Sequence, residues 1–191
     1  EDDILGRLFP GGNPGRDGIP AGDGGLARRL LKIPLKSTKE RVEAMRAVVT
    51  RVSSASVTIA GETVGAIETG YLVLLGIAPA DTQETARKLA EKVCNLRVFE
   101  DENGKMNLNL EQVGGSLLVV SQFTLFADTS SRRPGFTGAA KPDVAVPLYE
   151  AFMARCRERG FVVAHGEFGA SMQVTSVNDG PVTILFDTEK L

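Results

Sequence analysis

The run YLVLLGIA, residues 71–78, consists almost entirely of apolar side chains and has the length of a single strand. Such a run predicts a β-strand that is buried on both of its faces. Two later segments, residues 82–97 and 143–159, carry apolar side chains at helical spacing. Asp81 or Thr82 can cap the first segment, and Gly160 ends the second. The sequence therefore predicts a buried strand packed against two core-facing helices.

Strand-like segments lie on both sides of these helices. They are rich in β-branched residues and are separated by turns that contain glycine, such as Gly61-Glu62. About seven strands and two substantial helices predict an α+β fold, in which a curved, largely antiparallel sheet wraps around the helices. The expected strand segments are residues 46–52 continued by 56–59, then 64–67, 71–78, 116–125, 162–164, 172–177 and 182–186.

Residues 1–44 differ in composition from the rest of the chain. They are rich in glycine and proline and poor in large apolar residues, as an arm or linker would be. Within them, residues 26–35 read LARRLLKIPL, a short basic segment that can pack on the domain as a surface arm or serve targeting or RNA binding. We therefore expect an N-terminal arm, residues 1–44, followed by one domain, residues 45–191.

Charge, cysteine content and hydropathy restrict the class of protein. The formal net charge is only -2, so any contact with RNA must be local. The two cysteines, Cys94 and Cys156, lie on apolar helical faces, and buried packing in a reducing, cytoplasmic setting is the simplest interpretation. No apolar run reaches about 18 residues, which predicts no membrane span and no membrane partner.

Several kinds of catalytic site are disfavoured by the sequence. The chain has one histidine, His165, so a nucleophile with a histidine base requires that this residue happens to reach the site. The cysteines and His165 lack metal-ligand spacing, so we expect no metal. No glycine-rich phosphate-binding motif is present, and we expect no cofactor. Residues 100–104, EDENG, are typical of a solvated turn. The remaining possibility is a site that uses backbone dipoles, hydroxyl groups and groups of the substrate itself.

Two segments could supply such chemistry. Ser121-Gln122-Phe123-Thr124 follows an apolar strand, where backbone N–H groups can stabilise a developing oxyanion by roughly 3 kcal/mol each. Asn178-Asp179-Gly180-Pro181 has the composition of an ordinary turn, although its X-Pro bond can be cis. From composition alone, a strand end and a turn remain the simpler interpretations of these two segments.

Together with three other motifs, these segments resemble the D-aminoacyl-tRNA deacylase (D-tyrosyl-tRNA deacylase) family. The motifs occur in the family's order and spacing, and the resemblance covers Met45 to about Asp187. It implies a homodimer with the active site at the subunit interface, where Gly180-Pro181 of one subunit enters the pocket of the other. The matching stretches are residues 45–52 (MRAVVTRV), 104–107 (GKMN), 121–125 (SQFTL), 132–134 (RRP) and 177–183 (VNDGPVT).

The resemblance implies a hydrolase that cleaves the ester between a D-amino acid and the terminal adenosine of tRNA. This ester is activated and needs no strong protein nucleophile. Backbone groups around Phe123 and Thr124 would hold the carbonyl, while the ribose 2′-hydroxyl of the substrate helps to activate water. Thr124 is a candidate nucleophile, but a hydroxyl without a nearby base is a weak one. We therefore expect Thr124 to be an accessory residue.

The resemblance also implies how the wrong hand is rejected. Rigid carbonyls at Gly180-Pro181 would accept hydrogen bonds from the substrate ammonium, so that an L side chain collides with backbone while a D side chain or glycine fits. Glycyl-tRNA is then a potential further substrate. Four other residues are assigned by resemblance to the substrate site: Arg51 and Asn178 at the cross-subunit loop, Met172 along the pocket and Gln122 at its floor.

Contact with the acceptor end of tRNA is predicted for a basic segment. Arg132 and Arg133 can meet phosphates and Phe136 can stack on the terminal adenine, although a solvated basic turn explains them equally well. The chain departs from the family pattern at Gly135, where serine is common, and at Phe126, where tyrosine is common. An alternative function is a non-catalytic nucleic-acid-binding protein that reuses the fold and binds through Arg28 to Lys32 of the arm.

Overall fold

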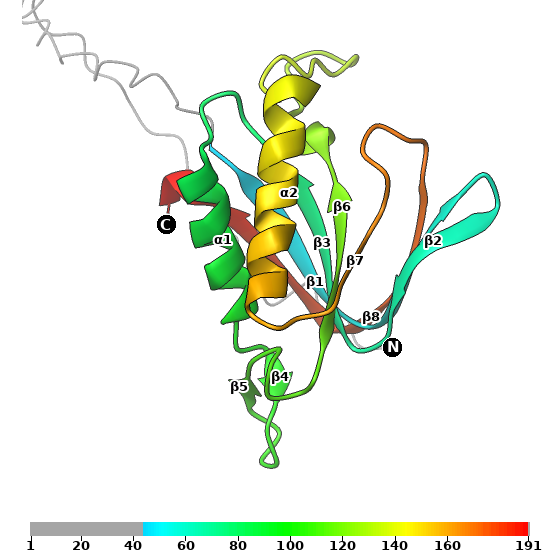
Figure 1. Cartoon of the computed structure of the whole chain (residues 1–191), viewed down its shortest axis with the longest axis vertical. Helices are drawn as coiled ribbons and strands as arrows, with labels where there is room; N and C mark the ends of the chain where they lie inside the picture. Colours follow the sequence, from blue (N-terminus) through cyan, green and yellow to red (C-terminus); the bar gives the residue numbers. More distant parts are fainter. Residues whose placement is uncertain (1–43, 191) are drawn as a thin grey trace, which may run out of the picture. The chain divides into compact units, whose positions relative to one another are not determined.

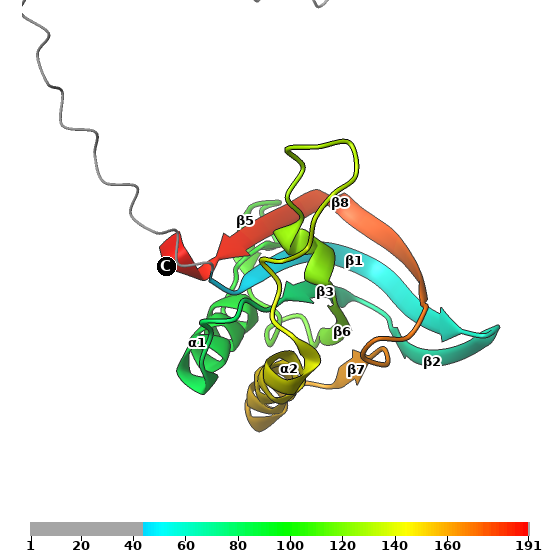
Figure 2. The ribbon, with the colours of Figure 1, turned by 90° about the horizontal axis from the view of Figure 1, so that it is seen from above.

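The computed structural model describes residues 44–190, which form a curved six-stranded sheet with two helices on one face (Figures 1 and 2). The expected arm, except Ala44, lies outside the described residues. None of the helices described in residues 44–190 is long and apolar enough to cross a membrane. The helices are α1 (Gln83–Cys94) and α2 (Pro142–Glu158), and the strands are β1 (Arg46–Ile59), β2 (Glu62–Ile67), β3 (Gly70–Gly76), β4 (Phe99–Glu100), β5 (Met106–Leu108), β6 (Ser116–Ser121), β7 (Val163–His165) and β8 (Gln173–Asp187).

Strand β1 organises the sheet. It pairs antiparallel with β2 and β3 along one edge and with β8 along the other. On the far side of β3, strands β6 and β7 continue the sheet in parallel pairings. The α+β fold with a curved sheet and two main helices is confirmed. Three of the five strand pairings in this sheet are antiparallel, and the two that involve β6 are parallel, so the sheet is mixed. Helices α1 and α2 provide the crossovers that these parallel pairings need.

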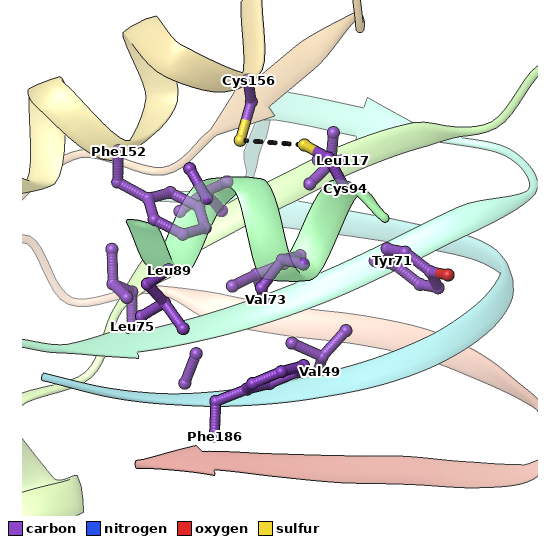
Figure 3. Close-up of a cluster of buried hydrophobic side chains, with 14 of the residues drawn as sticks. Val49, Tyr71, Val73, Leu75, Leu89, Cys94, Leu117, Phe152, Cys156 and Phe186 are labelled. Carbon is purple, nitrogen blue, oxygen red and sulfur yellow. Dashed lines mark hydrogen bonds between the residues drawn. The ribbon is translucent and has the colours of Figure 1, made fainter. Parts of the chain in front are cut away.

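Strand β3 is buried on both faces, as its continuous apolar sequence predicts. Tyr71, Val73 and Leu75 point into the core beneath the helices, where Phe152 and Leu89 approach the sheet (Figure 3). Leu72 packs into a second apolar cluster, which includes Leu118 and Val120 of β6. Because successive side chains alternate between faces, one strand serves both cores.

Helices α1 and α2 contact each other through a pair of buried, free thiols. Cys94 and Cys156 are both buried, and their Sγ atoms lie 3.7 Å apart at the contact between α1 and α2 (Figure 3). The Thr82 side chain caps α1 by accepting a hydrogen bond from the backbone N–H of Thr85. The expected burial of both cysteines and the expected capping of α1 by Thr82 are thus confirmed.

At the candidate site, two expected boundaries are wrong. Strand β6 ends at Ser121 rather than Leu125, because the chain turns into a 3-10 helix, η2 (Phe123–Phe126). Strand β8 runs without interruption from Gln173 to Asp187, whereas the sequence predicted two strands separated by a turn at residues 178–181.

Candidate active site

A pocket of about 140 Å³ opens where β3, β6 and η2 meet the start of α2. The predicted site residues Ser121, Gln122, Phe123 and Met172 all contribute to its wall. The rest of the lining is apolar or small, and none of it was singled out in the sequence. These further residues are Leu75, Ile77, Ala140, Ala145, Phe168, Gly169 and Ala170.

The turn η2 forms the rim of this pocket. The Gln122 backbone N–H donates to the Leu75 carbonyl at 2.8 Å, and the Gln122 carbonyl accepts from the Leu125 N–H at 3.2 Å. Phe123 and Thr124 begin the turn, so their N–H groups have no carbonyl within the helix to bond. Backbone donors beside an apolar pocket are a suitable arrangement for binding a carbonyl oxygen.

The side chains of η2 differ in their surroundings. Phe123 is 56% exposed, and its ring meets the ring of Phe136 edge to face with centroids 5.1 Å apart. The hydroxyl of Thr124 accepts a hydrogen bond from the side-chain amide of Gln122. This partner is a neutral amide donor, whereas activating the hydroxyl as a nucleophile would take a base.

The segment Asn178 to Pro181 forms a bulge in β8. Asn178 pairs with Val52 and Thr183 pairs with Thr50, so residues 179–182 all stand opposite Arg51. The Asn178 side chain accepts a hydrogen bond from the Val182 N–H at 3.3 Å, and the Gly180–Pro181 peptide bond is cis. Gly180 and Pro181 are exposed.

Arg51 supports this bulge from below and is only 6% exposed. Its guanidinium donates to the Asp179 carbonyl at 2.9 Å and to the Val98 carbonyl at 2.5 Å, and it pairs with the Asp179 carboxylate at 3.2 Å. The Phe99 ring lies 6.0 Å from the guanidinium carbon and stacks on Tyr71. Burial is the main cause that raises the pKa of Tyr71, so its hydroxyl stays protonated and donates to the Leu96 carbonyl.

The two predicted motifs do not meet within one chain. Strands β3 and β1 lie between β6, which ends at Ser121, and β8, which carries Gly180-Pro181. Ser121 is level with Leu75 and Ala47, while the bulge stands opposite Arg51, further along β1. Neither Gly180 nor Pro181 lines the pocket. Met172, just before β8 begins, does line it.

Arg132, Arg133 and Phe136 lie in the loop between η2 and α2, which projects beyond the first turn of α2 (Figure 1). All three side chains are exposed. Gly135 exchanges two backbone hydrogen bonds with Asp128, of 2.8 and 3.0 Å. A Cβ at this glycine would meet only the Asp128 Cβ, at 3.9 Å. The Cβ of the family's serine would therefore fit at this position without a clash.

The residues considered for histidine-based or carboxylate-based catalysis do not line the pocket. His165 is exposed at the end of β7, its Nδ1 lies 2.7 Å from the Gly166 carbonyl, and it does not line the pocket. The described residues contain no group of three or more His, Cys, Asp or Glu that could hold a metal ion. Glu100, Asp101 and Asn103 belong to the hairpin between β4 and β5, where the Asp101 carboxylate accepts backbone N–H groups of the turn.

Sequence reasoning missed Phe168, Gly169 and Ala170. A signal was present, because an aromatic residue stands beside glycine and alanine in a segment between two strands, and binding residues are common on such loops. The apolar contributions of Leu75, Ile77 and Ala145 had no such signal. They resemble ordinary core residues in the sequence.

Comparison with known proteins identifies the family. The family model described as D-Tyr-tRNA(Tyr) deacylase matches residues 48–187. A protein of Shewanella baltica named D-aminoacyl-tRNA deacylase is 62% identical over 140 residues, which cover 73% of this chain and 97% of the relative. A protein of Thermus aquaticus with the same name is 58% identical over 147 residues, covering 76% and 97% respectively.

Solved structures agree on the fold. A structure described as c-Myc DNA Unwinding Element Binding Protein has a TM-score of 0.70 at 42% identity, covering 74% of this chain and 97% of its own. A probable eukaryotic D-amino acid tRNA deacylase has a TM-score of 0.66 at 18% identity, with coverage of 75% and 99%, and shows the fold alone. The sequence matches therefore establish that this chain belongs to the D-Tyr-tRNA(Tyr) deacylase family.

Proposed function

We propose that this protein is a D-aminoacyl-tRNA deacylase, a hydrolase that cleaves the ester bond between a D-amino acid and tRNA and spares the L form. The observation that carries this conclusion is the 62% identity over almost the whole length of a relative with that name. The site agrees in its chemistry, because a small apolar pocket lies beside free backbone donors. We place the catalytic domain at residues 45–191 and the activity in the cytoplasm.

The reaction that suits this site uses water as the nucleophile. Water attacks the ester carbonyl carbon, the backbone N–H groups of Phe123 and Thr124 hold the oxygen as it gains charge, and the bond to the ribose oxygen then breaks. The departing ribose oxygen takes up a proton, and the neighbouring 2′-hydroxyl of the substrate assists the attacking water. Ser121 and Gln122 shape the pocket at the strand end, and Gln122 also bonds the Thr124 hydroxyl.

The active protein is, in our proposal, a homodimer. Gly180-Pro181 and the pocket lie on separate parts of one chain, so a second copy has to bring them together. Strand β8 has no strand on its outer edge within residues 44–190, and it exposes Val174, Val177 and Leu185. A long apolar edge strand is a common site of association, and a two-fold axis would complete two identical sites at once.

Chiral selection follows from that arrangement. The exposed backbone of Gly180-Pro181 would enter the partner's pocket and accept hydrogen bonds from the substrate ammonium. Arg51 fixes the bulge through the Asp179 carbonyl, Asn178 closes it from within, and Met172 lines the pocket wall. A D side chain would then point to open space. Glycine lacks a side chain to exclude, so glycyl-tRNA is a further substrate.

We propose that the loop between η2 and α2 binds the acceptor end of tRNA. Arg132 and Arg133 are exposed for phosphate contact. Phe136 is in contact with Phe123 at the pocket rim, where a terminal base can stack on exposed rings.

Deacylation of tRNA carrying labelled D- or L-amino acid tests the function. The chain of residues 1–191 should release the D-amino acid from tRNA and leave the L form intact. Equal hydrolysis of both forms, or hydrolysis of neither, would contradict the proposal. The alternative, nucleic-acid binding without catalysis, depends on Arg28 to Lys32, which lie outside the described residues. It predicts binding that disappears when residues 1–44 are deleted, whereas deacylation should survive that deletion.

A further inference from the structure

Arg46, the first residue of β1, connects the pocket rim to the far edge of the sheet. Its Nη1 donates a hydrogen bond to the Leu125 carbonyl of η2 at 2.9 Å. Its guanidinium carbon lies 4.8 Å from the centre of the Phe126 ring. On the other side, its Nε pairs with the Asp187 carboxylate at the end of β8, at 3.5 Å. One side chain thus holds a carbonyl and a ring of the same short turn.

Gly76 supports the same turn from β3, directly beside Arg46 in the sheet. A Cβ at Gly76 would come within 3.0 Å of the Gln122 carbonyl oxygen and of the Phe126 ring, and within 3.1 Å of the Leu125 Cβ. The turn therefore rests directly on the strand backbone. Arg46 and Gly76 together determine where η2 lies on the sheet.

A short 3-10 helix such as η2 needs contacts from outside the helix to hold its position. η2 has only four residues, and its recorded closing bonds join the Leu125 N–H to Gln122 and the Ala127 N–H to Thr124. Short 3-10 helices have poor hydrogen-bond geometry, and their last carbonyls have no partner within the helix. Arg46 donates a hydrogen bond to one of these carbonyls, that of Leu125, and a charged donor makes a stronger hydrogen bond than a neutral one.

We propose that Arg46 is a positioning residue for the reaction: it holds η2 so that the N–H groups at the start of the turn keep their aim at the substrate carbonyl. This inference rests on the proposed function and deepens it. Arg46 itself does not line the pocket and acts only through Leu125 and Phe126. Displacements of about 1 Å in such a site can reduce the rate about 100-fold, so a loosened turn has a large effect on kcat.

The test compares variants of Arg46 in the chain of residues 1–191. Arg46→Met keeps the apolar stem but removes the donor, and we expect kcat to fall by about 10- to 100-fold with KM for D-aminoacyl-tRNA changed less than about 3-fold. Arg46→Lys keeps a charged donor and should recover most of the loss. Arg87→Met removes an exposed arginine that pairs with Glu158 on the helical face, and it should leave kcat unchanged.

Two further measurements separate positioning from general stability. Asp187→Asn breaks the ion pair but leaves the bond to Leu125, so it should retain kcat. Hydrogen exchange over residues 122–127 should accelerate in Arg46→Met and not in Asp187→Asn. An effect of Asp187→Asn equal to that of Arg46→Met, or no recovery with lysine, would overturn the assignment, because a general loss of stability would then explain both.

The failure of this inference can be told apart from that of the function. An active, D-selective protein whose Arg46→Met variant keeps its kcat would overturn the positioning role alone. A protein that leaves D-aminoacyl-tRNA intact would overturn the proposed function and this role together.

Discussion

At the scale of single residues, Thr124 decides between two mechanisms. Its hydroxyl accepts a hydrogen bond from the side-chain amide of Gln122, which is a donor and not a base. We expect Thr124→Ala to retain deacylation within about 10-fold of the original kcat, since water assisted by the ribose hydroxyl needs no protein nucleophile. Single-turnover deacylation of D-aminoacyl-tRNA measures this rate directly.

Thr85→Ala is a matched control, because Thr85 also pairs its hydroxyl with a nearby side chain but does so on α1, at Thr82. It should leave the rate unchanged. Complete loss of turnover in Thr124→Ala, with substrate binding intact, would make threonine the nucleophile instead.

The residues of the site differ in how far the sequence could reveal them. Arg51 and Asn178 were assigned by family motif, and the structure gives each a physical partner, the Asp179 carbonyl and the Val182 N–H. Arg46 belonged to the same motif but received no role, because its partner Leu125 is 79 residues away in the sequence. Contacts between such distant residues form only after the sheet has brought them together.

At the scale of elements, the contact between α1 and α2 contains a carboxylate that responds to pH. Glu91 pairs with Arg155 and Arg159. Burial alone would raise the pKa of Glu91, but the hydrogen bonds and charges of the two arginines outweigh it and lower the pKa. Its contribution to stability is therefore present above the unfolded-state pKa of about 4.3 and is lost as the pH falls through the lower folded-state pKa.

We expect Glu91→Gln to reduce the free energy of unfolding at pH 7 by about 0.5 to 1 kcal/mol, and the difference from the original protein to narrow as the pH approaches 3. Urea unfolding at the two pH values measures both. Glu84→Gln, which removes an exposed partner of Lys88, should have a smaller effect at pH 7. A difference that widens in acid would show that Glu91 has a raised pKa.

Elements with regular apolar spacing were predictable, and those shaped by tertiary contacts were not. The spacing of α1 and α2 and the continuous apolar run of β3 were correctly interpreted. Residues 123–126, FTLF, have strand composition, but Phe126 turns back to pack against Arg46 and Gly76, which ends β6 early. Asn178 to Pro181 has turn composition, yet the buried Arg51 holds it as a bulge within β8. In both segments, tertiary contacts outweigh the local conformational preference of the residues.

At the scale of the whole molecule, the proposed dimer makes a prediction about pairs of variants. Gly180→Ala would place a Cβ 2.4 Å from the Val182 backbone nitrogen, at a φ of +154° that disfavours alanine, and should disable the bulge. Ala170→Phe adds a large ring to the wall of the pocket, whose volume is only about 140 Å³, and should block it. Each homodimer should be folded and inactive, as circular dichroism and deacylation would show.

Heterodimers then distinguish a shared site from one built within a single chain. In the shared arrangement, a Gly180→Ala chain paired with an Ala170→Phe chain contains one intact site, because one chain supplies the pocket and the other the bulge. Purified through two different tags, it should have about half the activity of the original dimer, since a two-fold dimer has two identical sites. Both substitutions on one chain, paired with an unaltered chain, damage both sites and should abolish activity. A site within one chain predicts the reverse, activity in the second heterodimer and none in the first.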